Sequence, residues 1–232
     1  MTCLSIACRY ARIRDVKLLV NKFNADVTVR GDAGETVLHD ACMSKVDTRQ
    51  KIAYLISKER HLLRAATKNG TLSIHMASRR HNPEALQTLL EYVDDPLLNT
   101  PTKHGRTPLH VSVHYGCYDN VKLLLARRDL DVNAQDCNGD TPLHHIVIGQ
   151  RLDILVAIAT ESRWQENVVN LKGKTAIETL GCVPRALYNI RCSSYEKAET
   201  ATTRLNKAIR DEHGNNMLIL HALVTWMVIR RS

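Results

Sequence analysis

The chain repeats a short phrase at a nearly constant interval, and this interval constrains its fold more than any single motif does. Thr-Pro-Leu-His occurs at residues 107–110 and again at residues 141–144, 34 residues further on. Weaker copies stand at intervals of 34 to 36 residues, so that the series begins at Thr2, Thr36, Leu72, Thr107, Thr141 and Thr175. A fixed period of this length is typical of a solenoid, because one helix pair cannot bury its apolar face alone and must stack on a neighbour.

The copies also carry the local signals of a helix start. Thr is a favourable capping residue, and the Pro that follows it at 108 and 142 suits the first helical turn, where its missing N–H costs nothing. A large apolar residue and a small one three positions later, such as Leu38 and Ala41, share one helical face and predict close helix packing. Before the helix starts, tight turns that demand a positive φ are expected at Gly34, Gly70, Gly105, Gly139 and Gly173.

Residues 102–135 resemble an almost complete ankyrin repeat. Gly105 precedes the Thr-Pro-Leu-His phrase, Gly116 closes the first expected helix, an apolar run covers residues 121–125, and Asp-Val-Asn-Ala ends the unit at residues 131–134. The resemblance implies an all-α solenoid of about six to seven helix-turn-helix units with finger hairpins and an atypical C-terminal helical cap. Because a solenoid has no central core, we expect one elongated domain.

We expect repeats over residues 1–192 and divergent helices over residues 193–232, which continue the stack as a terminal or seventh repeat. The expected units are 1–31, 32–66, 67–101, 102–135, 136–169 and 170–192. The first unit lacks a preceding finger, which suits either a fragment of a longer protein or a degenerate cap. The apolar run over residues 217–229 falls short of the roughly 20 residues that a membrane-spanning helix needs, so it predicts a terminal helix and no membrane span.

Composition points to an aliphatic core and a reducing compartment. Hydrophobic residues make up 44% of the chain but aromatic residues only 4%. The seven cysteines are odd in number and include no Cys-x-x-Cys pair, which argues against a secreted disulfide framework. No charged-then-apolar signal segment opens the chain. These features predict an intracellular, cytoplasmic protein, and the nucleus or the cytosol of a host cell is also compatible with them.

The histidines do not form a metal motif. Four of them occupy the same place in the repeat, where we expect the ring to bond the backbone of an adjoining finger: His39, His75, His110 and His144. His110 and His114 have a spacing that suits zinc, but no Glu follows the first and no third ligand has a fixed offset. The chain also lacks a Gly-x-Ser-x-Gly elbow and a phosphate-cradling glycine loop. We therefore expect no catalytic residues, no cofactor, no metal and no enzymatic activity.

Candidate functional residues lie on the surface instead. The resemblance implies that partners lie across a concave face made of finger tips and the exposed side of the inner helices. Basic residues concentrate at these positions in the third and fourth units, flanked by Tyr115, and Arg and aromatic residues are enriched at binding hot spots. The predicted partner-binding residues are Lys68, Arg79, Arg80, Lys103, His104, Arg106, His114 and Tyr115. A net charge of +8 adds a field that favours an anionic partner.

The sequence thus predicts a non-catalytic protein–protein interaction scaffold that binds an acidic or phosphorylated segment of another protein. One alternative is contact with nucleic acid or an anionic membrane through the same basic surface. We expect nucleic acid less than protein, because the chain shows no nucleic-acid module and no interleaved aromatic stacking platforms. A regulatory domain of a larger enzyme, channel or adaptor is a further alternative, and the basic residues are also compatible with a merely solvating role. The sequence does not define an oligomeric state.

Overall fold

The computed structural model describes residues 2–180, except positions 94, 150, 152–153, 155–157, 159–160, 162, 166 and 177. These residues form helices and connecting loops, with one isolated bridge between Val169 and Thr175 and no strand among them. The predicted all-α repeat class is confirmed. The expected C-terminal helices of residues 193–232 lie outside the described residues. The chain divides into two compact units, residues 1–131 and 132–232, which are considered separately below.

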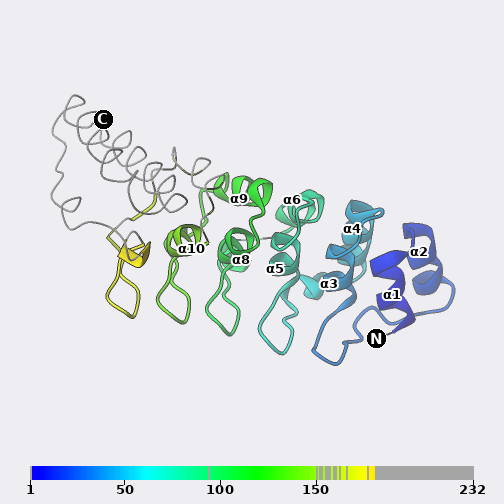
Figure 1. Ribbon diagram of the computed structural model, residues 1–232. Helices are drawn as coiled ribbons and strands as arrows, with labels where there is room; N and C mark the ends of the chain where they lie inside the picture. The colour runs from blue at the N-terminus through cyan, green and yellow to red at the C-terminus, as the bar shows by residue number, and fades with distance from the viewer. Residues whose placement is uncertain are drawn as a thin grey trace. The chain divides into compact units, whose positions relative to one another are not determined.

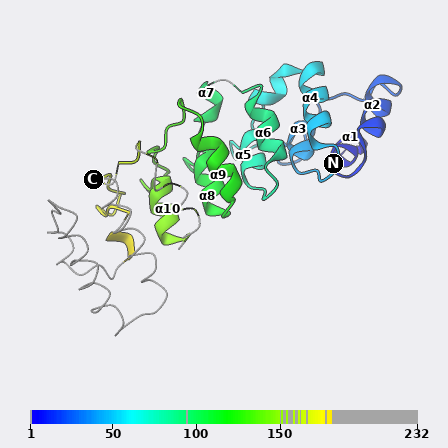
Figure 2. The same cartoon turned by 90° about the horizontal axis from the view of Figure 1, so that it is seen from above.

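The first unit consists of helix pairs that stand side by side in chain order (Figures 1 and 2). Within each pair we call the first helix inner and the second outer. Inner helices pack on inner helices of the next pair, and outer on outer. The pairs are α1 (Cys3–Tyr10) with α2 (Ile13–Asn21), α3 (Val37–Cys42) with α4 (Thr48–Lys58), α5 (Ser73–Ser78) with α6 (Glu84–Leu90), and α8 (Pro108–His114) with α9 (Tyr118–Leu125). The short helices η1 (Arg60–Arg64) and α7 (Asp95–Leu98) lie in the connections.

The core follows the predicted spacing. Leu38 and Ala41 are both fully buried on α3, as are Ala77 on α5 and Leu109 on α8. Cys8 is also buried, and burial raises the pKa of its thiol to about 12. The apolar and small residues of the inner helices therefore form the seam between neighbouring pairs, which explains why the repeat preserves their spacing.

The repeated histidines join each inner helix to the finger that follows. The Nδ1 atom of His39 accepts hydrogen bonds from the backbone N–H of Thr36 at 3.2 Å and from its hydroxyl at 2.9 Å. The opposite ring atom, Nε2, then donates to the carbonyl of Thr71, 2.9 Å away. His75 makes the same connection between Leu72 N–H at 3.1 Å and the carbonyl of Arg106 at 3.2 Å. The expected bond to the adjoining finger is confirmed, and it fixes both tautomers.

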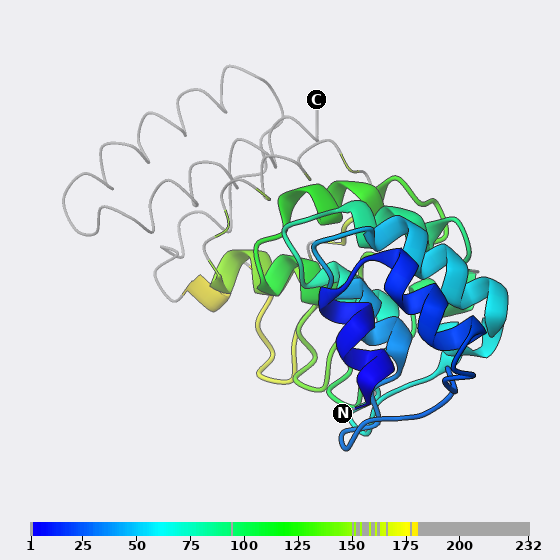
Figure 3. The same ribbon diagram turned by 90° about the vertical axis from the view of Figure 1, so that its right-hand side faces the viewer.

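Each finger is a short loop closed by a backbone hydrogen bond. The first finger, residues 31–35, closes from Gly31 N to Glu35 O at 2.8 Å; the second, residues 67–71, closes at 2.9 Å and the third, residues 102–106, at 3.0 Å. Figure 3 shows these loops gathered at one end of the helix pairs. The fingers are also joined to one another, because Lys68 N–H donates to Ala33 O at 2.8 Å and Lys103 N–H donates to Asn69 O at 3.0 Å.

The glycine of the second finger has two physical reasons to be there. Gly70 has a φ of +73°, which is strained for a residue with a Cβ. A Cβ at Gly70 would also lie only 2.9 Å from the backbone nitrogen of Lys103 on the third finger. The repeat therefore needs glycine both for the turn and for the close approach of the next finger.

The second unit has the same Thr–His contact and the same bond from the His ring to the following finger. Helix α10 (Pro142–Ile148) begins after Thr141, and His144 bonds Thr141 on one side and the carbonyl of Lys174 on the other, at 3.0 Å. The sequence copy at Thr175 is followed by the short helix η2 (Glu178–Leu180). No helix in the described part of the chain is long and apolar enough to span a membrane, and residues 217–229 are outside that part.

Candidate functional site

The predicted basic surface falls into two groups at the two ends of the inner helices. Arg79, Arg80, His114 and Tyr115 follow the inner helices or end them, and we call them the helix-end group. Lys68, Lys103, His104 and Arg106 lie on the second and third fingers, and we call them the finger group. The six residues of α5 separate the second finger from Arg79, which corresponds to about 9 Å of helix rise. A ligand that touches both groups must therefore extend along an inner helix.

Within the helix-end group, residues from two consecutive units are in contact. The guanidinium of Arg79 lies 5.0 Å from the centroid of the Tyr115 ring, a cation–π arrangement. The ring of His114 meets the same ring edge-on, with centroids 5.1 Å apart. Arg79 is exposed and Tyr115 is 41% exposed. The structure thus brings together Arg79, His114 and Tyr115, which the repeat register placed on neighbouring helices.

The backbone that carries Arg79 and Arg80 is held by a buried residue that sequence reasoning missed. The side-chain Nδ2 of Asn120, on α9, donates to the carbonyls of Ala77 at 3.2 Å, Ser78 at 3.1 Å and Arg80 at 2.6 Å. Asn120 therefore adds hydrogen bonds to carbonyls in the last turn of α5 and in the turn that follows it, where helical partners run out. This contact positions the two arginines at the end of the helix.

A signal for the Asn120 contact was present in the repeat register. Lys51 on α4 is fully buried and donates to the carbonyl of Cys8 at 3.1 Å and to the hydroxyl of Ser44 at 2.8 Å. Lys51 follows Cys8 by 43 residues, as Asn120 follows Ala77. Burial lowers the pKa of the Lys51 ammonium. A polar residue at this place of an outer helix therefore indicates a cap for the preceding inner helix.

In the finger group, Lys68 and Lys103 occupy equivalent places on consecutive fingers. Their backbone bonds to Ala33 and Asn69 hold the two fingers together, and both side chains are exposed, as is that of His104. Arg106 is only half-exposed, and its carbonyl accepts the bond from His75. Lys68, Lys103 and His104 therefore form the accessible part of this group, while Arg106 also belongs to the framework.

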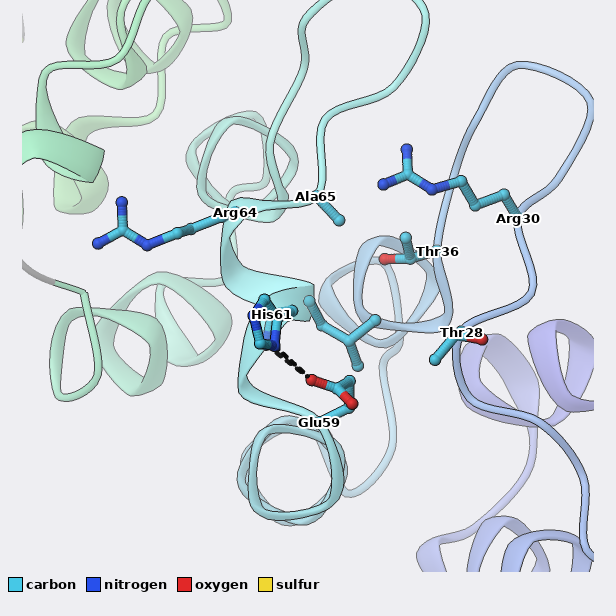
Figure 4. Close-up of a pocket in the computed structure, with 8 residues that line it drawn as sticks. Thr28, Arg30, Thr36, Glu59, His61, Arg64 and Ala65 are labelled. Carbon is cyan, nitrogen blue, oxygen red and sulfur yellow. Dashed lines mark hydrogen bonds and ion pairs between the residues drawn. The ribbon is translucent and has the colours of Figure 1, made fainter.

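A hollow of about 460 Å³ lies elsewhere in the first unit, and sequence reasoning did not predict it. Figure 4 shows Arg30 at one edge, the ion-paired His61 and Glu59 at another, and the side chain of Arg64 turned away. Arg30 donates to the carbonyl of Ala66 at 2.7 Å, and His61 bonds Glu59 at 2.8 Å. Because these polar groups are already engaged within the protein, we assign the hollow no ligand. Its lining residues are Thr28, Arg30, Thr36, Glu59, His61, Leu62, Arg64 and Ala65.

A group with metal-ligand chemistry lies in the second unit. The ligand atoms of Asp136, Asp140 and His145 lie within 4.8 Å of one another. One carboxylate oxygen of Asp136 accepts the N–H groups of Asn138 and Asp140, and the other lies 3.0 Å from His145 Nε2. Burial alone raises the pKa of Asp136, but these hydrogen bonds outweigh it and hold the pKa below its usual range. The arrangement is that of a hydrogen-bonded finger turn.

The histidine pair that the sequence singled out for its spacing is not brought together as ligands. The Nδ1 atom of His110 lies 2.9 Å from the hydroxyl of Thr107 and accepts from the backbone N–H of the same residue, and the side chain is fully buried. His114 is exposed at the other end of α8 and stacks edge-on against Tyr115. The two rings therefore have separate roles in the structure.

Comparison with known proteins agrees with this architecture. A family model described as "Ankyrin repeats (3 copies)" matches residues 50–136. The chain carries ankyrin repeats. The ankyrin repeat domain of Bcl-3, described as a unique member of the IkappaB protein family, superimposes with a TM-score of 0.64 at 25% identity, covering 77% of this chain and 79% of that one. Ankyrin-repeat domains generally mediate protein–protein interaction.

Similar sequences occur within much longer proteins. Neurogenic locus notch homolog protein 1 from Xenopus tropicalis is 28% identical over 172 residues, which is 68% of this chain and 7% of the relative. A transient receptor potential cation channel subfamily A member 1 homolog from Caenorhabditis elegans is 38% identical over 108 residues, 45% of this chain and 8% of the relative. The B-cell lymphoma 3 protein homolog of Mus musculus is 29% identical over 133 residues, which is 56% of this chain and 29% of the relative. The ankyrin-repeat chain thus spans less than a third of each of these relatives.

Proposed function

We propose that this ankyrin-repeat chain is a non-catalytic scaffold that binds an acidic or phosphorylated segment of a partner protein on the helix-end and finger groups. The observation that carries the proposal is the Arg79–Tyr115 pair, in which an exposed guanidinium is oriented by an aromatic ring of the next unit. A planar guanidinium suits bidentate recognition of carboxylate and phosphate. An oriented Arg loses less side-chain freedom on binding than a mobile one.

The finger group supplies the second half of the proposed surface. The side chains of Lys68 and Lys103 make no hydrogen bond or ion pair with any residue in the described ranges, so their ammonium groups face solvent. Ammonium groups attract a carboxylate or phosphate as point charges. An extended acidic segment running along α5 would meet Lys68 at one end of the helix and Arg79 at the other.

We also propose the setting and the domain organisation that the sequence indicated. Cys3, Cys8, Cys42 and Cys137 are free thiols, which suits the reducing cytoplasm, and the nucleus or a host-cell cytosol is compatible with the same chemistry. Repeats over residues 1–192, followed by divergent helices over residues 193–232, remain our proposal for the domains. A role as the regulatory domain of a larger protein is compatible with the proposed binding.

The test is a double charge reversal with a matched control. Arg79→Glu with Lys103→Glu should weaken binding of a polyglutamate peptide and of a phosphoserine peptide by about tenfold, since exposed ion pairs contribute about 0.2–1 kcal/mol each. Lys58→Glu with Lys122→Glu changes the net charge equally but lies on the outer helices α4 and α9. Calorimetric titration of both variants compares the surfaces directly, and thermal unfolding should stay nearly unchanged in both.

Equal affinity in the two double variants would refute the proposed surface. Loss of duplex DNA binding in the Arg79→Glu, Lys103→Glu variant, with peptide binding unchanged, would favour nucleic acid instead. Raising the salt concentration should slow peptide association, because the Debye length at physiological ionic strength is about 8 Å and exposed charges are screened beyond it.

A further inference from the structure

The three fingers of the first unit do not carry the same charge. The first finger presents Asp32 and Glu35, whereas the second presents Lys68 and the third presents Lys103 and His104. The side chain of Asp32 is exposed and makes no hydrogen bond or ion pair with the residues that the structure describes, and the same holds for the side chains of Lys68 and Lys103. The row of fingers therefore changes from acidic to basic along the chain.

The nearest cation to the first finger in sequence forms no ion pair with that finger in the described part of the chain. Arg30 directly precedes the first finger, but its Nη1 donates to the carbonyl of Ala66, 2.7 Å away on the segment that leads into the second finger. Glu35 accepts the N–H of Ala33 at 3.1 Å, which keeps its carboxylate at the tip of its own finger. Asp32 and Glu35 thus remain together on the first finger, with Arg30 held by the next segment.

The positions of these charges are fixed relative to one another. Backbone bonds join the first finger to the second and the second to the third, and a Cβ at Gly34 or Gly70 would come within 3.0 Å of the following finger's backbone nitrogen. The row is therefore a backbone-linked array in which the acidic and basic tips keep their order and spacing. A bound segment must match that order, because like charges placed together cost affinity and suppress wrong partners.

We propose that the partner segment is of mixed charge and binds with one polarity, its basic stretch against the first finger and its acidic stretch against the second and third fingers. This inference rests on the finger-group part of the proposed function and adds the first finger to that surface. A uniform polyanion such as nucleic acid or an anionic membrane would match the second and third fingers but meet Asp32 and Glu35 with like charge. The acidic first finger thus selects a protein segment that carries both signs.

The test uses two synthetic probes and one reversed charge. The mixed peptide has a run of Lys, a flexible Gly-Ser linker and a run of Glu, while the acidic peptide replaces the Lys run with Glu. Asp32→Lys should lower the affinity for the mixed peptide by about threefold and raise the affinity for the acidic peptide by about threefold, as expected for one exposed charge. Asp119→Lys, an equal reversal at an exposed position on α9, is the control and should change neither affinity.

A second measurement places the ends of the mixed peptide. A photo-crosslinker at its Lys end should form adducts with residues 31–35, and the same group at its Glu end should label residues 67–71 and 102–106. Adducts spread equally over the three fingers, or shifts of the same sign for both peptides in Asp32→Lys, would overturn the polarity. The proposed function is tested separately by Lys103→Glu, which should lower the affinity for both peptides. If Lys103→Glu changes neither affinity, or if neither peptide binds at all, both proposals fail.

Discussion

The two ends of the inner helices differ in how much they vary from unit to unit. At the starts, the same Thr–His contact recurs with nearly the same geometry, at 2.9 Å for Thr36–His39 and for Thr107–His110 and 2.8 Å for Thr141–His144. At the ends the residues differ in every unit, from an Arg-Tyr pair in α1 to the two arginines after α5 and the His-Tyr pair at α8. The repeated residues therefore hold the units together, and the residues that depart from the repeat are the ones to which we propose to assign recognition.

The largest effect should be on stability, in a comparison of one substitution at the start of α10 with one at its end. Leu143 at the start of α10 is 2% exposed and Ile148 at its end is 54% exposed. Leu143→Ala should reduce the free energy of unfolding by about 2–5 kcal/mol, because it removes buried surface and leaves a cavity. Ile148→Ala should cost less than about 0.5 kcal/mol. Denaturant unfolding measures the free energy of unfolding of both variants. A similar loss at the two positions would contradict the view that the helix starts hold the units together and the helix ends do not.

The next effect concerns pH and the buried start of α5. Burial is the main reason that the pKa of His75 falls to about 4 in the fold, against 6.5 for an unperturbed His. Because the folded state disfavours the charged ring, the stabilisation is fully present above pH 6.5. It is lost as the pH falls toward 4, by about 3 kcal/mol at the end of that range. Urea midpoints measured between pH 7 and pH 4 test this.

A matched variant assigns the pH effect to His75. His75→Gln should be less stable than the parent at pH 7 and should lose less stability between pH 6.5 and pH 4, since Gln does not titrate. The remaining slope belongs to other groups, among them His39, whose pKa is also lowered by burial. An identical slope in the parent and in His75→Gln would contradict the neutral buried ring.

The smallest effect should be on binding and not on stability. Tyr115→Leu removes the ring that orients Arg79, and we expect polyglutamate binding to weaken by roughly two- to fivefold, in line with about 0.5–1 kcal/mol for an exposed cation–π contact. Tyr118 on α9 is similarly exposed, at 37%, and has Lys122 over its ring at 5.3 Å. Tyr118→Leu is therefore the control; an equal loss of binding there would show that the helix ends have no special part in recognition.

The sequence predicted the framework better than the surface, and for a physical reason. The Thr–His bond, found at the starts of α3, α8 and α10, and the finger glycine depend on backbone geometry that recurs along the stack, so their residue types recur and can be recognised. Asn120 looks like a solvent-facing polar residue on an outer helix, yet it is 1% exposed, since its role depends on carbonyls that a turn of another unit leaves open. Arg106 is likewise half-buried, and its carbonyl accepts a hydrogen bond from His75, which is distant in sequence.

The predicted surface itself was only coarsely placed. Periodicity identified which residues share a register position, and Arg79 with Tyr115 did come into contact. Periodicity did not reveal that the finger group and the helix-end group lie a helix length apart. A register position identifies equivalent residues in different units but does not give the distance between two side chains.

The main-chain hydrogen bonds between the fingers also affect how the sequence of such a surface can evolve. Lys68 and Lys103 hold their fingers in the row through main-chain N–H groups alone, and their side chains play no part in that link. A substitution at a finger tip therefore alters what the row displays without loosening the row, provided the glycine stays. Specificity is then free to change one finger at a time, because each exposed tip can be replaced while the main-chain bonds that hold the row stay in place.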